Sequence, residues 1–99
     1  MYMAREVFHC HPGKAKELVR IFKDLAPAFK ELGGSDIRIY TDVSGEKYWT
    51  VIIEQEFESI DNLADISRRT MSDPRVADKF KGYHEFVADG KRELYKREA

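Results

Sequence analysis

The apolar positions between residues 14 and 32 predict a long amphipathic helix, because they recur every three or four residues. Gly33 and Gly34 end this helix, since glycine adopts the left-handed C-terminal conformation at low cost. Pro27 lies inside it and removes one backbone hydrogen bond, so we expect a kink there. The apolar set is Leu18, Ile21, Phe22, Leu25, Phe29 and Leu32.

Three strands are predicted around this helix. Residues 1–9 form the first, which Pro12 and Gly13 end, because proline cannot donate to a strand ladder. Residues 36–43 alternate between apolar and polar side chains, as a half-buried strand does. Residues 48–57 form another strand after a short polar turn, so the last two strands are predicted to form a hairpin.

The C-terminal half contains two helix-start signals. Ser59 is a favourable N-cap for a helix over residues 60–69. Asp73 and Pro74 repeat the signal, with a capping carboxylate followed by proline at the first helical position. The second helix is predicted to continue until Gly90, with residues 91–98 as the last strand. Its apolar face is Val76, Phe80, Tyr83 and Val87, at helical spacing.

The resulting element order is β-α-β-β-α-β. A helix between the first two strands prevents them from forming a tight hairpin, and this order is typical of the α+β, ferredoxin-like fold. We therefore predict a four-stranded antiparallel sheet with its helices on one face. The length of 99 residues fits a single domain over residues 1–99.

The uncovered face of this sheet predicts a homodimer. Alternation places Ile37, Ile39, Thr41 and Val43 on the helix side, together with the odd-numbered residues from Trp49 to Phe57. The opposite face still carries Tyr40, Tyr48, Thr50 and Ile52, although no helix is available to cover it. Exposed apolar patches of this kind usually mark interfaces, and two such faces packed together would enclose a barrel-like space.

Composition and the first ten residues indicate which classes of partner and which cellular compartment to expect. The net charge of −1 gives no excess of basic residues for a nucleic-acid surface. Cys10 is the only cysteine, so an intrachain disulfide is excluded and a reducing compartment is favoured. Residues 1–10 carry Arg5 and Glu6 and show neither a signal-peptide nor a membrane-span pattern. We therefore expect a cytoplasmic protein without membrane or nucleic-acid partners.

Histidines and aromatic side chains are the candidate functional residues. His84 could act as a base or as a metal or haem ligand, because histidine titrates near neutrality. It could equally be a helix histidine that only packs. Aromatic residues could line a ligand pocket, although aromatics at helix and strand spacing are more often plain core. The predicted pocket residues are Tyr40, Trp49, Phe80, Tyr83 and Phe86.

Two further pairs are weighed as sites. His9 and His11 would point the same way on a strand, but no third metal ligand is identifiable and a catalytic metal normally needs three. We therefore predict no metal site. Glu54 and Glu56 share one strand face and could act as a carboxylate pair, or Glu54 could pair with Arg38 across the hairpin.

With this order of elements, the chain resembles the dimeric α/β barrel superfamily. The segment REVFHCHPGKAKELVRIFKDL, from Arg5 to Leu25, is similar to the first strand, Pro-Gly break and long helix of that group. The segment from Met71 to Glu98 resembles its helix, glycine and charged last strand. The superfamily includes antibiotic biosynthesis monooxygenases, haem-degrading monooxygenases and NIPSNAP-type proteins. The resemblance implies a ligand between sheet and helices, and dimers formed sheet against sheet.

The haem-degrading branch is compared residue by residue. Its haem-ligating histidine follows a phenylalanine by four positions, and Phe80 to His84 has that spacing. The branch also has an asparagine in the first strand, which this chain lacks. Its tryptophan before the Ser-Asp step is replaced here by the run Arg68, Arg69 and Thr70. We therefore expect no cofactor, with haem kept as an alternative.

The sequence accordingly predicts a homodimer that binds a small apolar or aromatic ligand between sheet and helices. The alternative is a cofactor-independent monooxygenase acting on a phenolic or quinol-like substrate, with His84 as the base. In that reaction the substrate carbanion reduces oxygen, while the protein supplies a dry pocket and a hydrogen bond. Haem binding through His84 is a third hypothesis.

Overall fold

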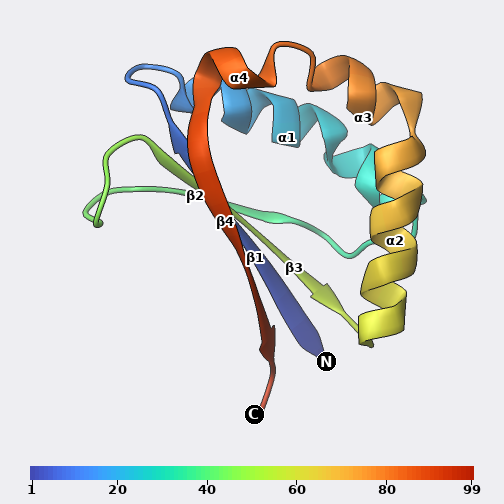
Figure 1. Ribbon diagram of the computed structural model, residues 1–99. Helices are drawn as coiled ribbons and strands as arrows, with labels where there is room; N and C mark the ends of the chain where they lie inside the picture. Colours follow the sequence, from blue (N-terminus) through green and yellow to red (C-terminus); the bar gives the residue numbers. More distant parts are fainter.

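The computed structural model describes residues 1–99 as one four-stranded sheet with all helices on one of its faces (Figure 1). It extends 35 × 34 × 18 Å, and the short dimension corresponds to two layers of secondary structure. No helix in it is long and apolar enough to cross a membrane. The elements are β1 (Tyr2–Cys10), α1 (Ala15–Glu31), β2 (Arg38–Thr41), β3 (Thr50–Phe57), α2 (Ile60–Ser72), α3 (Pro74–Lys79), α4 (Tyr83–Phe86) and β4 (Val87–Lys96).

The sheet has the predicted ferredoxin-like topology. Its strand order is β2-β3-β1-β4, and every neighbouring pair is antiparallel. The two long strands β1 and β3 lie in the centre, so their residues determine what each face presents. The α+β fold class and the placement of the helices on one face are therefore confirmed.

The core lies between the two central strands and α1. Leu18 of α1 and Val51 of β3 are completely buried. Phe8 of β1 packs on Phe22 of α1, with ring centroids 5.4 Å apart. Burying a side chain such as Leu18 contributes about 2–3 kcal/mol of hydrophobic free energy. The predicted apolar face of the first helix is thus the face that attaches it to the sheet.

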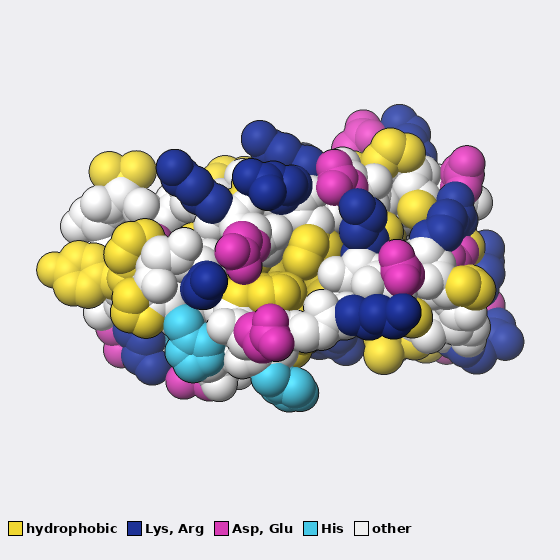
Figure 2. Space-filling model, turned by 90° about the horizontal axis from the view of Figure 1, so that it is seen from above, with side chains coloured by type: hydrophobic (Ala, Val, Ile, Leu, Met, Phe, Trp, Pro, Cys, Tyr) yellow, Lys and Arg dark blue, Asp and Glu magenta, His cyan; other side chains and the backbone are white.

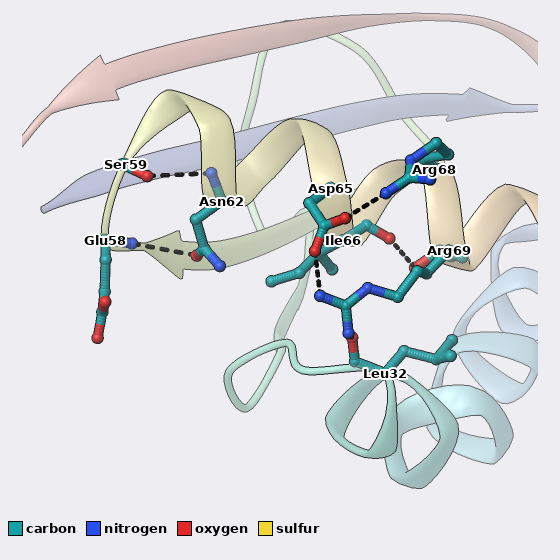
Figure 3. Close-up of polar contacts among 9 residues, drawn as sticks. Leu32, Glu58, Ser59, Asn62, Asp65, Ile66, Arg68 and Arg69 are labelled. Atoms are coloured by element: carbon teal, nitrogen blue, oxygen red, sulfur yellow. Dashed lines mark hydrogen bonds and ion pairs between the residues drawn. The ribbon is translucent and has the colours of Figure 1, made fainter.

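Helix α2 is capped and tied to α1 as Figure 3 shows. The Ser59 hydroxyl accepts a hydrogen bond from the Asn62 backbone N–H at 3.0 Å, which confirms Ser59 as the N-cap. Asp65 pairs with Arg68 and Arg69, one turn further along the helix. Arg69 also donates to the Leu32 carbonyl at 3.0 Å. This contact fixes α2 at the C-terminal end of α1.

The predicted long helix after Asp73 is wrong in its second half. Asp73 caps α3 and Pro74 is its first residue, as predicted, but α3 stops at Lys79. Gly82 then adopts a left-handed backbone, with φ of 76°, and turns the chain into the single-turn α4. β4 begins at Val87, so Gly90 lies inside a strand opposite Phe8 and does not end a helix.

The hairpin strands are shorter than predicted. Only residues 38–41 and 50–57 pair, and Val43, expected on the helix side, is fully exposed. The reason lies at Trp49, which is the only non-glycine residue with a positive φ, at 59°. A left-handed residue cannot continue a strand, so β3 begins at Thr50.

Candidate functional site

A cavity of about 450 Å³ lies between the sheet and the helices α1, α2 and α3. Phe8 and Ile53 contribute from the sheet, whereas Phe22 and Phe29 contribute from α1. Thirteen of the eighteen lining residues are hydrophobic. A largely apolar cavity with a few polar groups, of this size, is the usual form of a small-molecule site.

The two charged groups of the cavity come from neighbouring strands of the sheet. Glu6 of β1 forms an ion pair with Arg92 of β4, with Oε1 and Nη2 2.6 Å apart, and both residues line the cavity. Gln55 and Tyr83 also line it. Burial raises the pKa of the Tyr83 phenol, and repulsion from the Glu6 carboxylate and from the Cys10 thiol in its ionised form adds to this shift. Tyr83 therefore stays protonated and can donate a hydrogen bond to a bound molecule.

Only two of the five predicted pocket residues line the cavity. Phe80 and Tyr83 both line the cavity, with ring centroids 5.9 Å apart. Tyr40 pairs with Ile52 on the hairpin, is 46% exposed and does not line the cavity. Trp49 lies beside α1 in a separate groove. Phe86, at the end of α4, is buried in the core cluster.

His84 lies outside the cavity. It belongs to the short α4 and is exposed, while its neighbour Tyr83 turns inward. The two rings meet edge-on, with centroids 5.5 Å apart. No histidine lines the cavity, so His84, the haem ligand considered from the sequence, is not placed to ligate a group bound there.

His9 and His11 are separated by the end of β1. His9 Nδ1 lies 2.5 Å from Asp89 Oδ1, and Lys47 Nζ lies 3.9 Å from the other carboxylate oxygen. The hydrogen bond from His9, followed by the charge of Lys47, lowers the pKa of Asp89. His11 is exposed beyond the strand. No three His, Cys, Asp or Glu side chains converge as a metal site.

The open face of the sheet, opposite the helices, carries a central ion network. Arg5 Nε lies 2.9 Å from Glu54 Oε2, and Arg38 Nε lies 3.6 Å from Glu54 Oε1. Arg5 also approaches Glu93, at 3.8 Å, and its guanidinium lies 5.6 Å from the Tyr95 ring centroid. The pairing of Glu54 with Arg38 across the hairpin is therefore confirmed.

Sequence reasoning overlooked Glu6 and Arg92. The signal was available for Glu6, because it shares the parity of Phe8 and Ala4 on β1 and must point toward the helices. Arg92 could not be placed in the same way. The strand that contains it was predicted to begin four residues later than it does.

Comparison with known proteins identifies the fold only. No family model matches the chain, and no curated protein matches it. A NIPSNAP domain protein from Burkholderia xenovorans superposes with a TM-score of 0.84 at 16% identity, covering 100% of this chain and 96% of that one. A NIPSNAP family protein from Agrobacterium tumefaciens gives 0.80 at 14% identity, covering 96% and 90%.

A third solved structure extends the comparison. It is a candidate antibiotic biosynthesis monooxygenase from Deinococcus radiodurans, with a TM-score of 0.72 at 15% identity, covering 100% of this chain and 94% of that one. The chain has the fold of these proteins. The resemblance inferred from the sequence to the NIPSNAP and antibiotic biosynthesis monooxygenase group is confirmed at this level. Because the sequence identity to these proteins is so low, the structural similarity shows a shared fold but not a shared activity.

Proposed function

We propose that the chain is a homodimeric binding protein that holds a small apolar or aromatic molecule in the cavity between sheet and helices. The observation that carries the proposal is the cavity itself, whose wall is mostly hydrophobic and aromatic. Tyr83 and the Glu6–Arg92 pair supply a few polar contacts on that wall. Such groups orient a ligand, while the apolar area provides most of its affinity.

A neutral fluorescent probe, N-phenyl-1-naphthylamine, tests this binding. Ser67 of α2 lines the cavity, so Ser67→Phe fills part of it. We expect the wild-type chain to bind about one probe per chain, and the variant to bind at least about tenfold more weakly through steric exclusion.

The matched control is Ala64→Phe. Ala64 lies three residues earlier on the same helix, is exposed and does not line the cavity. This variant should bind the probe as the wild type does. Equal binding by wild type and Ser67→Phe, or no saturable binding by the wild type, would contradict the proposed cavity ligand.

The proposed dimer uses the open face of the sheet. Tyr40 and Tyr95 are each 46% exposed, and Ile52 is half-buried. Arg5 and Glu54 already neutralise each other within one chain, so covering them in an interface buries no unpaired charge. The face therefore combines apolar area with internally paired charges, as a buried interface requires.

Oxygenation is the second candidate function. The observation that favours it is Glu6, a carboxylate on the wall of an apolar cavity that also contains Tyr83. A carboxylate in such surroundings can remove a proton from a phenol or quinol, after which the substrate itself reduces oxygen. The fold shared with the Deinococcus radiodurans structure adds to this candidate.

Oxygen uptake with anthrone and quinol substrates tests the second candidate. We expect Glu6→Gln to lower any uptake at least about 100-fold, the usual size of a general-base contribution. His84→Ala is the control, since His84 is exposed away from the cavity. No uptake above the protein-free rate, or equal rates for Glu6→Gln and wild type, would leave only the binding function.

A further inference from the structure

A second concave site lies outside the cavity, between α1 and the β2–β3 connection. This groove has a volume of about 600 Å³, and none of its lining residues lines the cavity. Lys16, Arg20 and Lys23 form one wall, at helical spacing along α1. Trp49 and Tyr48 form the opposite wall. Viewed from above, basic side chains gather near hydrophobic ones at the end where this connection projects (Figure 2).

The charges of this groove differ from those elsewhere on the molecule. Of the 17 lysines and arginines, only Lys16, Arg20 and Lys23 have no carboxylate within 4.0 Å. Every other lysine and arginine has at least one carboxylate within that distance. Three unmatched cations in a single concave site form a place where an anion is attracted.

The two carboxylates that line the groove are already engaged. Asp24 pairs with Lys79 of α3, with oxygen and nitrogen 3.1 Å apart. Asp42 accepts a hydrogen bond from the Thr50 backbone N–H at 2.8 Å. Neither carboxylate lies within ion-pair distance of the three helix cations. The groove therefore keeps its positive character along α1.

The aromatic wall has a fixed backbone. Trp49 is held at φ of 59°, a conformation that side-chain-bearing residues rarely adopt. Its carbonyl accepts a hydrogen bond from the Cys10 N–H at 2.9 Å, and the next residue, Thr50, is held by Asp42. The indole is 44% exposed and lines the groove. A positioned, half-exposed indole offers a stacking surface for a planar ring.

We infer that this groove binds a nucleotide, with the base stacked on Trp49 and the phosphates along Lys16, Arg20 and Lys23. Lys16 and Lys23 are seven positions apart on the helix, about 10 Å at 1.5 Å per residue. That length exceeds one phosphate and suits a diphosphate or triphosphate. A nucleotide combines a planar ring, which matches the aromatic wall, with an extended anion, which matches the basic wall. The proposed nucleotide site does not depend on the proposed cavity ligand.

Fluorescence titration with ADP, without divalent cations, tests the inference. Trp49 is the only tryptophan, so a change in indole emission reports on this groove alone. Adenosine supplies the ring without the charge, and inorganic pyrophosphate supplies the charge without the ring. We expect ADP to bind at least about tenfold more tightly than either, and its affinity to fall as salt screens the cations.

Charge-removing variants locate the anion. Lys16→Gln, Arg20→Gln and Lys23→Gln should each weaken ADP binding about threefold to fivefold, the range of exposed charge contacts, and the triple variant should abolish it. Lys30→Gln is the control, because Lys30 lies on the same helix but pairs with Asp36 at 3.0 Å. Circular dichroism checks that each variant is folded.

Several outcomes would overturn the inference. These are ADP binding no tighter than pyrophosphate, adenosine binding equal to ADP, or a triple variant that binds as the wild type does. Trp49→Leu, measured by calorimetry because its fluorescence is lost, should bind ADP no better than pyrophosphate. Ser67→Phe should leave ADP binding unchanged, which separates failure of this site from failure of the cavity.

Discussion

The two faces of the sheet are built from the same strands, but one is apolar and covered by helices, whereas the other is open and carries a network of charges. On the covered face, Phe8, Val51 and Ile53 are buried against the helices, and the one ionic contact on the cavity wall is Glu6 with Arg92. On the open face, Arg5 belongs to a network of charges that includes residues of all four strands. The alternation of side chains along a strand determines which face each one occupies. The helices then determine whether a polar group is exposed to water, as on the open face, or available to a bound ligand, as in the cavity.

This difference places both the core and the cavity on the same face of the sheet. The covered face contributes most of the hydrophobic free energy and also contains the cavity, so a substitution there affects both. The open face contributes little to the folding of one chain, because its charges are partly solvated and its apolar side chains are partly exposed. Four substitutions test this contrast, in order of expected effect.

The largest effect is expected for Leu18→Ala on the covered side. Leu18 is completely buried, so the substitution leaves a void in the core and should lower the free energy of unfolding by about 3 kcal/mol. Urea denaturation measures the loss. Ile52→Ala, on the open face, should cost about 1 kcal/mol at concentrations where the chain is monomeric. Equal losses for the two variants would contradict the contrast.

Gly90→Ala should be next. A Cβ added at Gly90 would lie 2.5 Å from the Val7 carbonyl oxygen, and backbone cannot move away as a flexible side chain can. We expect a loss of about 2 kcal/mol in urea denaturation, because β1 and β4 must separate locally. Lys91→Ala, at the adjacent exposed position, should change stability by less than about 0.5 kcal/mol. A Gly90→Ala variant as stable as wild type would show that β4 shifts freely.

Tyr40→Glu should change assembly without changing the fold. The added negative charge would have to lose its water when the proposed interface forms, so the dimer dissociation constant should rise at least about tenfold, about 1.4 kcal/mol. Sedimentation equilibrium measures it. Tyr48→Glu is the control, since Tyr48 is 86% exposed and lies outside the sheet. A wild-type chain that is monomeric at tens of micromolar would remove the proposed dimer.

Asp89→Asn should have the smallest effect, and the effect should depend on pH. His9, and then Lys47, lower the pKa of Asp89 in the folded chain below its ordinary value of 3.8. The ionised carboxylate therefore stabilises the fold above that value, and the contribution is lost as pH falls through the lowered pKa. The urea midpoints of variant and wild type should differ slightly at about pH 6 and coincide near pH 2. A difference that grows toward acid pH would contradict this assignment.

The sequence was sufficient for the elements whose patterns are local. The apolar stripe of α1 and the caps at Ser59 and Asp73 are determined by residues within one or two turns. The β-α-β-β-α-β order then leaves few ways to pair the strands, which is why the topology was predicted correctly.

Two boundaries depended on contacts that no local pattern contains. The helical spacing from Val76 to Val87 continues across Gly82, yet the left-handed glycine breaks the helix and β1 recruits Val87 onward as β4. Trp49 looked like an inward strand residue. Its backbone is instead left-handed, with its carbonyl accepting a hydrogen bond from the N–H of Cys10, far away in the sequence, and the next N–H, of Thr50, donating to Asp42.

The candidate site was predicted only where it coincided with the helix pattern. Phe80 and Tyr83 both line the cavity, as their helical spacing predicts for residues on the same side of the segment after α2. Tyr40 and Trp49 were grouped with them by residue type alone, but Tyr40 lies on the open face of the sheet and Trp49 lines the separate groove beside α1. His84 was chosen for its chemistry, but the turn at Gly82 directs Tyr83 inward and leaves His84 exposed.

Successive side chains of strand β1 point to opposite faces of the sheet. Phe8 touches the cavity, while Val7 and His9 on either side of it occupy the other surface of the sheet. A ligand that moves the backbone of Phe8 would also move Val7 and His9. If ligand occupancy alters self-association by some factor, thermodynamic reciprocity requires self-association to alter ligand affinity by the same factor.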